Sequence, residues 1–174
     1  MKALVIYNSK TGFTKRYAQW IGEDAGCECV DFKEGAKRNL SDYDAVVFGG
    51  WCMAGGITKV SWLKKKIPEL SRAGKKIIVF AVGASPADSP DIPEGMRNNF
   101  SEEEWKSVKV FYCPGGLDYS RMNFMSRTLM GMLAKSLSKK KDATESDRKK
   151  AEMISRSYDI SDRKYIVPIV SEIK

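Results

Sequence analysis

The stretch ALVIYNSKTGFT, residues 3–14, decides the fold, because an apolar run of strand length passes through a glycine-containing loop into a helical pattern. Continuous rather than alternating hydrophobicity is typical of a strand buried on both faces. Three hydroxyl residues surround one glycine where the helix should begin: Ser9, Thr11 and Thr14 around Gly12. Free N–H groups at a helix N-terminus, joined by hydroxyl donors, predict an anion site that needs no arginine clamp. For the loop alone, a helix cap with spare hydroxyls explains the residues equally well.

The remaining strands and helices alternate along the chain. Apolar runs of strand length occur at 45–49, 77–82 and 108–113, with a weaker edge run at 27–32. Strands that alternate with helical patterns predict a parallel sheet wound by right-handed crossovers, hence an α/β fold. With 174 residues, the chain is long enough for one good core and too short for two comfortable domains.

Helical spacing predicts the elements between the strands. We expect helices over 14–24, ended by Gly26, over 58–70, and after a capping box at Ser101–Glu104. A closing helix should be kinked at Pro168.

A further predicted helix, over 121–137, carries a methionine-rich face. The face comprises Met122, Met125, Leu129, Met132 and Leu133. Such a face usually provides adaptable core packing, and a binding surface or a membrane-facing surface is the alternative.

Composition excludes several classes of chemistry. The chain has no histidine, which rules out His-based acid–base catalysis, Ser-His-Asp sites and His-ligated metals, and we expect no metal. The four cysteines do not suggest a disulfide framework, and the pair Cys27 and Cys29 is expected to be buried thiols rather than a metal site. A net charge of +8 without a nucleic-acid-binding motif favours an acidic substrate or an anionic membrane surface as partner, and no nucleic acid. The densest basic stretch, 135–150, suits a solvated loop and helix end, or alternatively a binding patch.

A second unusual loop, GGWCMAGGIT at 49–58, follows the next strong strand. In an open parallel sheet the ligand crevice lies beyond the carboxyl ends of the strands, so this loop and the first should meet there. Trp51 among glycines can stack on a planar ring, whereas a core tryptophan is the alternative. No Walker motif and no GxGxxG pattern is present, which disfavours ATP and dinucleotides. The two loops together therefore suggest a phosphate monoester joined to a flat heterocycle.

At this point the sequence resembles the flavodoxin superfamily, since SKTGFT matches the phosphate loop [ST]-x-T-G-x-T and GGWCMAGG resembles a ring-binding loop. The resemblance implies a three-layer α/β/α sandwich with a five-stranded parallel sheet of order 2-1-3-4-5, and FMN as cofactor. The tail GGLDYSRMNFMSRTLMGMLAKSL, residues 115–137, is similar to that of flavodoxin-like protoporphyrinogen dehydrogenases, which are menaquinone-linked. We therefore expect one domain, 1–174, with a helical and basic insertion at about 117–150 before the last helix.

The resemblance also implies cofactor-binding residues, which form four groups. They are Ser9, Lys10, Thr11, Gly12, Phe13 and Thr14 around the phosphate; Gly50, Trp51, Cys52, Met53, Ala54, Gly55 and Gly56 along one side of the ring; Gly83, Ala84, Ser85 and Pro86 along the other; and Gly115, Gly116, Leu117 and Tyr119 after the last strand. No catalytic side chain is implied, because the flavin carries the electrons.

The resemblance implies an FMN-dependent oxidoreductase that oxidises a protoporphyrinogen-like substrate and passes electrons to a quinone. A flavodoxin-type electron carrier serving protein partners, or a non-catalytic anion-binding module, are the alternatives. Flavodoxin carriers are typically acidic, whereas this chain is basic, and positive surroundings would make the flavin easier to reduce. Since the apolar runs are short, we expect a cytoplasmic protein, with peripheral association with the inner face of an anionic membrane as a further expectation.

Overall fold

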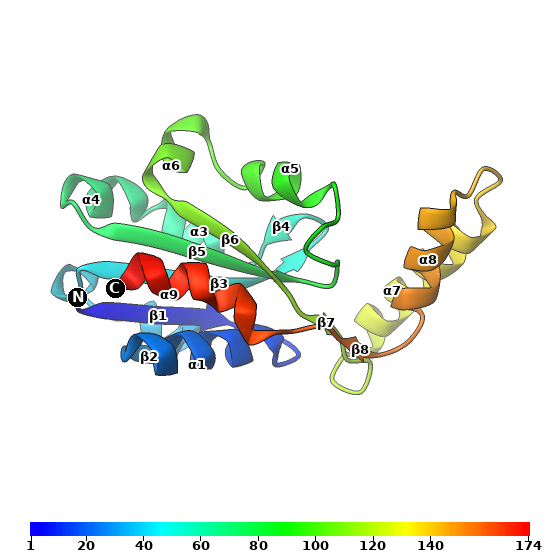
Figure 1. Ribbon diagram of the computed structural model, residues 1–174, viewed down its shortest axis with the longest axis horizontal. Helices are drawn as coiled ribbons and strands as arrows, with labels where there is room; N and C mark the ends of the chain where they lie inside the picture. The colour runs from blue at the N-terminus through cyan, green and yellow to red at the C-terminus, as the bar shows by residue number, and fades with distance from the viewer.

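A parallel sheet forms the centre of the computed structural model, which describes residues 1–174 (Figure 1). Its main strands are β1 (Ala3–Asn8), β2 (Glu28–Asp31), β3 (Ala45–Met53), β5 (Lys76–Gly83) and β6 (Lys109–Pro114). They lie side by side in the order β2-β1-β3-β5-β6, and every pair is parallel. Numbered along the chain, these five strands have the order 2-1-3-4-5, which confirms the expected flavodoxin-like sheet. A short strand, β4 (Gly56–Ile57), pairs antiparallel with the end of β3.

Helices cover both faces of the sheet because successive strand residues point to opposite sides. Leu4 and Ile6 of β1 belong to one core, whereas Ala3 and Val5 belong to the other. The first core is closed by α3 (Val60–Lys64), α4 (Ile67–Arg72), α5 (Ile92–Arg97) and α6 (Glu102–Ser107), and the second by α1 (Phe13–Ala25), the 3₁₀ turn η2 (Arg163–Ile166) and α9 (Val167–Ile173). The short elements α2 (Phe32–Gly35) and η1 (Leu40–Asp42) connect β2 to β3.

Most helix ends follow their expected signals. Gly26 ends α1 in a left-handed conformation, and the capping box at Ser101 and Glu104 begins α6. The single helix expected over 58–70 is wrong, since α3 ends at Lys64 and α4 begins at Ile67. Pro68 has no N–H to bond the Lys64 carbonyl and instead fits the first turn of a new helix.

The closing helix also begins at its proline. Pro168 lies in the first turn of α9, so it starts this helix rather than kinking it.

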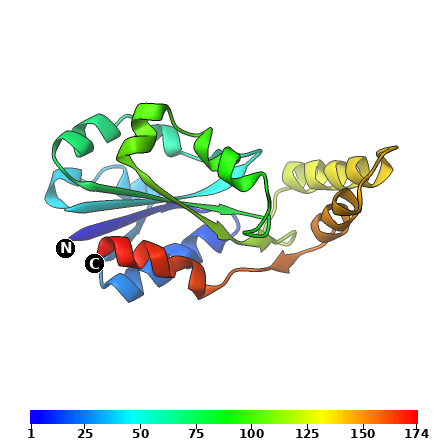
Figure 2. The ribbon, with the colours of Figure 1, turned by 45° about the horizontal axis from the view of Figure 1, so that its top comes forward.

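The chain leaves the sheet after β6 and forms a helical hairpin that projects from the carboxyl end of the strands (Figures 1 and 2). The hairpin consists of α7 (Phe124–Lys139) and α8 (Glu145–Ile154), and its neck is a two-stranded sheet of β7 (Gly116–Leu117) and β8 (Tyr158–Asp159). A small core of Leu117, Ala134 and Ile154 holds it together. None of the helices combines the length and the apolarity that crossing a bilayer requires.

The core role favoured for the methionine-rich face is wrong. Met125, Leu129, Met132 and Leu133 are 79%, 62%, 64% and 44% exposed. Only Met122 packs against the small core of the hairpin. The hairpin has room for one packed side of α7, the side that carries Ala134 and Met130, and the other apolar side faces outward.

Candidate functional site

The loop between β1 and α1 has the geometry of an anion-binding helix start. Gly12 is the N-cap of α1 with a φ of 104°, a left-handed conformation that favours glycine. The N–H of Gly12 donates to Ser9 Oγ at 3.2 Å, and no side chain caps the helix. Thr14, in the first turn, is only 1% exposed. The first N–H groups of α1 therefore remain available as donors, with the positive end of the helix dipole behind them.

An arginine that the sequence did not associate with this loop lies directly over it. Arg121 Nη1 donates to the Thr11 carbonyl at 3.2 Å. The same nitrogen is 2.6 Å from the point where a Cβ on Gly12 would lie, so a larger residue would displace the guanidinium. Asp118 pairs with Arg121 Nε at 3.4 Å and helps to hold it. An arginine thus lies beside the neutral donors that the sequence indicated, and no local signal could have linked residues 110 positions apart.

Lys10 connects the same loop to two other elements. Its Nζ donates to Ser126 Oγ of α7 at 2.8 Å and lies 5.1 Å from the centre of the Trp51 ring. The half-buried Trp51 therefore stands beside the anion loop, as the order of the strands requires. The structure thus brings the first two sequence-predicted groups together.

The second group forms a hairpin rather than the expected glycine-bracketed loop. β3 continues through Met53, the chain turns at Ala54 (φ 49°) and Gly55 (φ 80°), and β4 pairs back with Cys52 opposite Ile57. Both turn residues have a positive φ, as in the tight turns that match the twist of paired strands. The hairpin fixes the position of Trp51 by the pairing of β3.

The first glycine pair of this stretch serves packing. A Cβ on Gly49 would lie 2.0 Å from the Phe80 ring, and one on Gly50 would lie 2.6 Å from Ile57 Cγ2. Both glycines are buried in β3. Their presence is explained by these close approaches, so they do not indicate a mobile backbone around a ligand.

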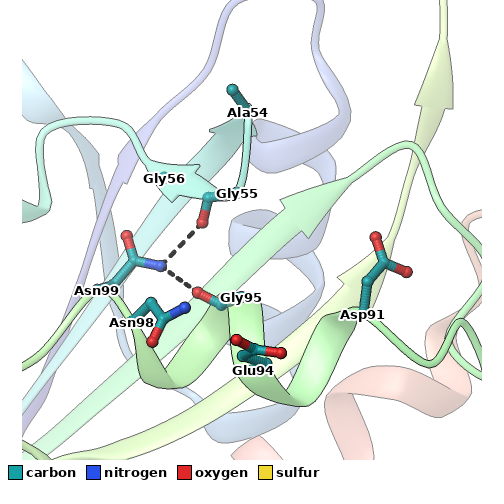
Figure 3. Close-up of a pocket in the computed structure, with 8 residues that line it drawn as sticks. All are labelled: Ala54, Gly55, Gly56, Asp91, Glu94, Gly95, Asn98 and Asn99. Atoms are coloured by element: carbon teal, nitrogen blue, oxygen red, sulfur yellow. Dashed lines mark hydrogen bonds between the residues drawn. The ribbon is translucent and has the colours of Figure 1, made fainter.

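Asn99 holds the tip of the hairpin from the neighbouring segment, as Figure 3 shows. Its Nδ2 donates to the carbonyls of Gly55 and Gly95 at 2.9 and 2.7 Å, while its Oδ1 accepts from the N–H of Ile57 at 2.7 Å. A cleft of about 440 Å³ opens here between the hairpin and α5. It is lined by Ala54, Gly55, Gly56, Asp91, Glu94, Gly95, Asn98 and Asn99. The cleft is acidic and contains no residue of the anion loop, so it would not hold a phosphate.

Two tyrosine hydroxyls fix the third group, residues 83–86. Tyr112 donates to the Ser85 carbonyl at 2.8 Å, and Tyr158 of the neck donates to the Ala84 carbonyl at 2.6 Å. Sequence reasoning assigned neither tyrosine to the site. Because Tyr158 comes from β8, the neck of the helical hairpin directly positions a loop at the carboxyl edge of the sheet.

The fourth group divides into two parts. The N–H of Gly115 donates to the Gly83 carbonyl at 2.7 Å, and a Cβ at Gly115 would lie 3.2 Å from Phe13. This glycine therefore lies between the first and third groups. Leu117 and Tyr119 instead serve the insertion: Leu117 is buried in its core, and the Tyr119 hydroxyl donates to the Ile154 carbonyl.

Two thiols and two tyrosine hydroxyls near this edge are kept neutral by burial. Burial raises the pKa of the Cys52 thiol to about 12. Burial, together with the nearby Tyr119, raises the pKa of the Tyr158 hydroxyl to about 12 as well. Burial also raises the pKa of Cys113 and of Tyr112. None of these groups is ionised near neutral pH, so they act as donors or packing groups and not as nucleophiles.

The strand order, with an uncapped glycine-led helix start at the carboxyl ends of β1 and β3, is that of a doubly wound α/β protein with a ligand-binding crevice at this edge. A family model described as a flavodoxin domain matches residues 4–144. The chain belongs to the flavodoxin family, as the sequence indicated, and this membership supports FMN as its cofactor.

Individual proteins resemble the chain more distantly. A Leishmania major protein named protoporphyrinogen IX dehydrogenase [quinone] is 25% identical over 154 residues, which cover 83% of this chain and 67% of that protein. A flavodoxin structure from the domain Archaea is 15% identical, covers 99% of both chains and has a TM-score of 0.43. A flavoprotein in complex with FMN from Lactobacillus acidophilus is 14% identical, covers 65% of this chain and 91% of its own, and has a TM-score of 0.44.

The residues present fit FMN. The anion loop offers free N–H donors, a left-handed glycine and an overlying guanidinium, which suit a phosphate dianion. The half-buried indole of Trp51 suits the flat ring that a flavin would place beside it.

Proposed function

We propose that the chain binds one FMN non-covalently and oxidises a protoporphyrinogen-like substrate, with the electrons passing to a quinone. The main observation in support of FMN binding is that the anion loop, Arg121 and Trp51 lie close together at one edge of the sheet. The 25% identical relative from Leishmania major, through its name, supports the substrate and the acceptor.

Each part of the site has a defined task in this proposal. The N–H groups at the start of α1, together with Thr11 and Thr14, bind the phosphate, and Arg121 neutralises part of its charge. Trp51 packs against the ring, and the 83–86 loop, fixed by Tyr112 and Tyr158, bounds its other side. FMN supplies electron and hydride transfer when it is bound, so the protein needs no side-chain acid or base.

The partners follow from charge. A net charge of +8 suits a substrate that bears carboxylates, and it suits peripheral contact with an anionic membrane that contains the quinone. We place the protein in the cytoplasm, at the inner face of that membrane. No structural feature favours a soluble electron carrier over this assignment.

The test begins with the visible absorption spectrum of the purified protein and chromatography of the released cofactor. A two-band flavin spectrum with FMN released supports the cofactor, and porphyrinogen-dependent reduction of a soluble quinone supports the reaction. If the protein carries FMN but reduces no quinone, the flavodoxin-type electron carrier is the correct alternative. A colourless protein that takes up no added FMN would leave only the anion-binding module.

A further inference from the structure

Helix α7 has two apolar sides, although the hairpin uses only one of them. Ala134, Met130 and Leu137 pack against α8 and the small core of the hairpin. Met125 and Leu129 on the other side are 79% and 62% exposed. A solvated helix with a single packing partner needs one apolar stripe, so the second stripe has no role within this chain.

The exposed residues form one continuous stripe. Met125, Leu129, Met132 and Leu133 recur at spacings of three and four residues, which places them on the same side of a helix. Phe124 begins the helix at the end nearest the anion loop, where Ser126 contacts Lys10. Helix α7 itself runs from the neck, beside the carboxyl edge of the sheet, toward the tip of the helical hairpin (Figure 2).

Positive charge is concentrated in the same segment of the chain. Residues 124–156 contain nine basic and four acidic side chains, a net charge of +5 out of +8 for the chain. Lys135 and Lys139 are exposed on α7, and Lys140 and Lys141 continue from its end into the turn. Long basic side chains beside an exposed apolar stripe are typical of helices that lie in the headgroup region of a bilayer.

We infer that this stripe docks α7 onto an anionic lipid surface, parallel to the membrane and without crossing it. The inference deepens the proposed function, because it names the surface by which the protein would approach a membrane-held quinone. A second copy of the chain is a poorer occupant, since pairing two hairpins would bring together two bodies of net charge +5. An anionic bilayer can bury the apolar side chains of the stripe and attract the basic side chains near it.

The experiment is co-sedimentation of the full chain with phosphatidylcholine vesicles, with or without phosphatidylglycerol. Leu129→Glu tests the stripe, and Val167→Glu is the matched control, because these residues are 62% and 63% exposed and Val167 lies on α9 of the main body. We expect binding to the phosphatidylglycerol vesicles that weakens in high salt, is reduced about tenfold or more by Leu129→Glu, and is unchanged by Val167→Glu.

A charge variant separates the two contributions. Lys139→Gln combined with Lys141→Gln should weaken binding to phosphatidylglycerol vesicles, while binding to pure phosphatidylcholine stays weak and unchanged. Equal loss with both glutamate variants, or no binding to anionic vesicles, would overturn the inference. So would dimerisation that Leu129→Glu abolishes in the absence of lipid. If vesicles are not bound but the protein carries FMN and reduces a soluble quinone, the docking surface is wrong while the proposed function stands.

Discussion

Arg121 provides the sharpest test of where the cofactor phosphate lies. The guanidinium contacts the anion loop at 3.2 Å, and its side chain is 65% exposed. Two unit charges about 4 Å apart interact by about 1 kcal/mol in water and about 4 kcal/mol in an effective dielectric of about 20. Because the side chain is largely solvated, we expect Arg121→Ala to cost about 1–2 kcal/mol, a rise of about 5- to 30-fold in the Kd for FMN.

Riboflavin makes this prediction specific, because it has the same ring and no phosphate. Flavin fluorescence titrations should show that Arg121→Ala lowers the affinity for FMN and leaves the affinity for riboflavin nearly unchanged. The loss of FMN affinity caused by the substitution should shrink as salt is added. Arg156→Ala is the control, since Arg156 is an exposed arginine just after α8 that pairs only weakly with Glu152, at 4.0 Å. An equal loss of riboflavin affinity, or the same loss of FMN affinity in Arg156→Ala, would refute the placement of the phosphate.

The other predictions concern the threonine hydroxyls of the anion loop, the indole of Trp51, the β3–β4 hairpin and the neck of the helical hairpin. Replacing Thr11 and Thr14 together with valine removes two donors, so FMN affinity should fall by about 2–5 kcal/mol while riboflavin affinity changes little. Trp51→Ala should weaken FMN and riboflavin alike in the same titrations; loss of the folded circular dichroism spectrum would instead mean that this tryptophan is needed for the core. Asn99→Ala leaves two backbone groups of the β3–β4 hairpin and one of α5 without their amide partner, so urea denaturation should show a loss of about 1–3 kcal/mol, and an unchanged midpoint would contradict the anchoring role. Burial raises the pKa of Asp159, but hydrogen bonds from Ser161 and Arg16 outweigh burial and lower it, so the stabilisation of the neck by this carboxylate is present above about pH 4 and is lost as pH falls through the lowered pKa. Limited proteolysis of the helical hairpin should therefore increase in acid, and Asp159→Asn should remove that pH dependence.

Local sequence patterns were sufficient for four strands of the sheet and for the glycine-led turn after β1, whereas the strand order came from the family resemblance. The apolar runs specified β1, β3, β5 and β6, because strands buried on both faces must be continuously apolar. The loop after β1 needed only a glycine and hydroxyls at fixed spacing. Gly12 adopts the left-handed conformation that such a turn requires.

Contacts between distant segments escaped prediction. Arg121 reaches Thr11 only because the neck folds back against the edge of the sheet, and no periodic pattern encodes that approach. Tyr158 was missed for the same reason, since its hydroxyl acts on a loop 74 residues away. The methionine stripe of α7 was assigned to the core because composition cannot distinguish an apolar face that meets protein from one that meets nothing in the same chain.

The distribution of charge decides what the basic composition can do. Positive charge spread around a flavin would make it easier to reduce. In this protein, however, residues 124–156 carry +5 of the net +8. The cleft beside the β3–β4 hairpin contains the acidic residues Asp91 and Glu94. Beyond a Debye length of about 8 Å, exposed lysines at the far end of α7 act only weakly on a cofactor at the sheet. Lys10 belongs to the anion loop and Arg121 contacts it, and the charge of both would be largely neutralised by the phosphate itself. The excess charge therefore suits a surface that the hairpin touches better than it suits the potential of the flavin, and a flavin-loaded variant with neutralised hairpin lysines should lose lipid binding while its reduction potential stays nearly constant.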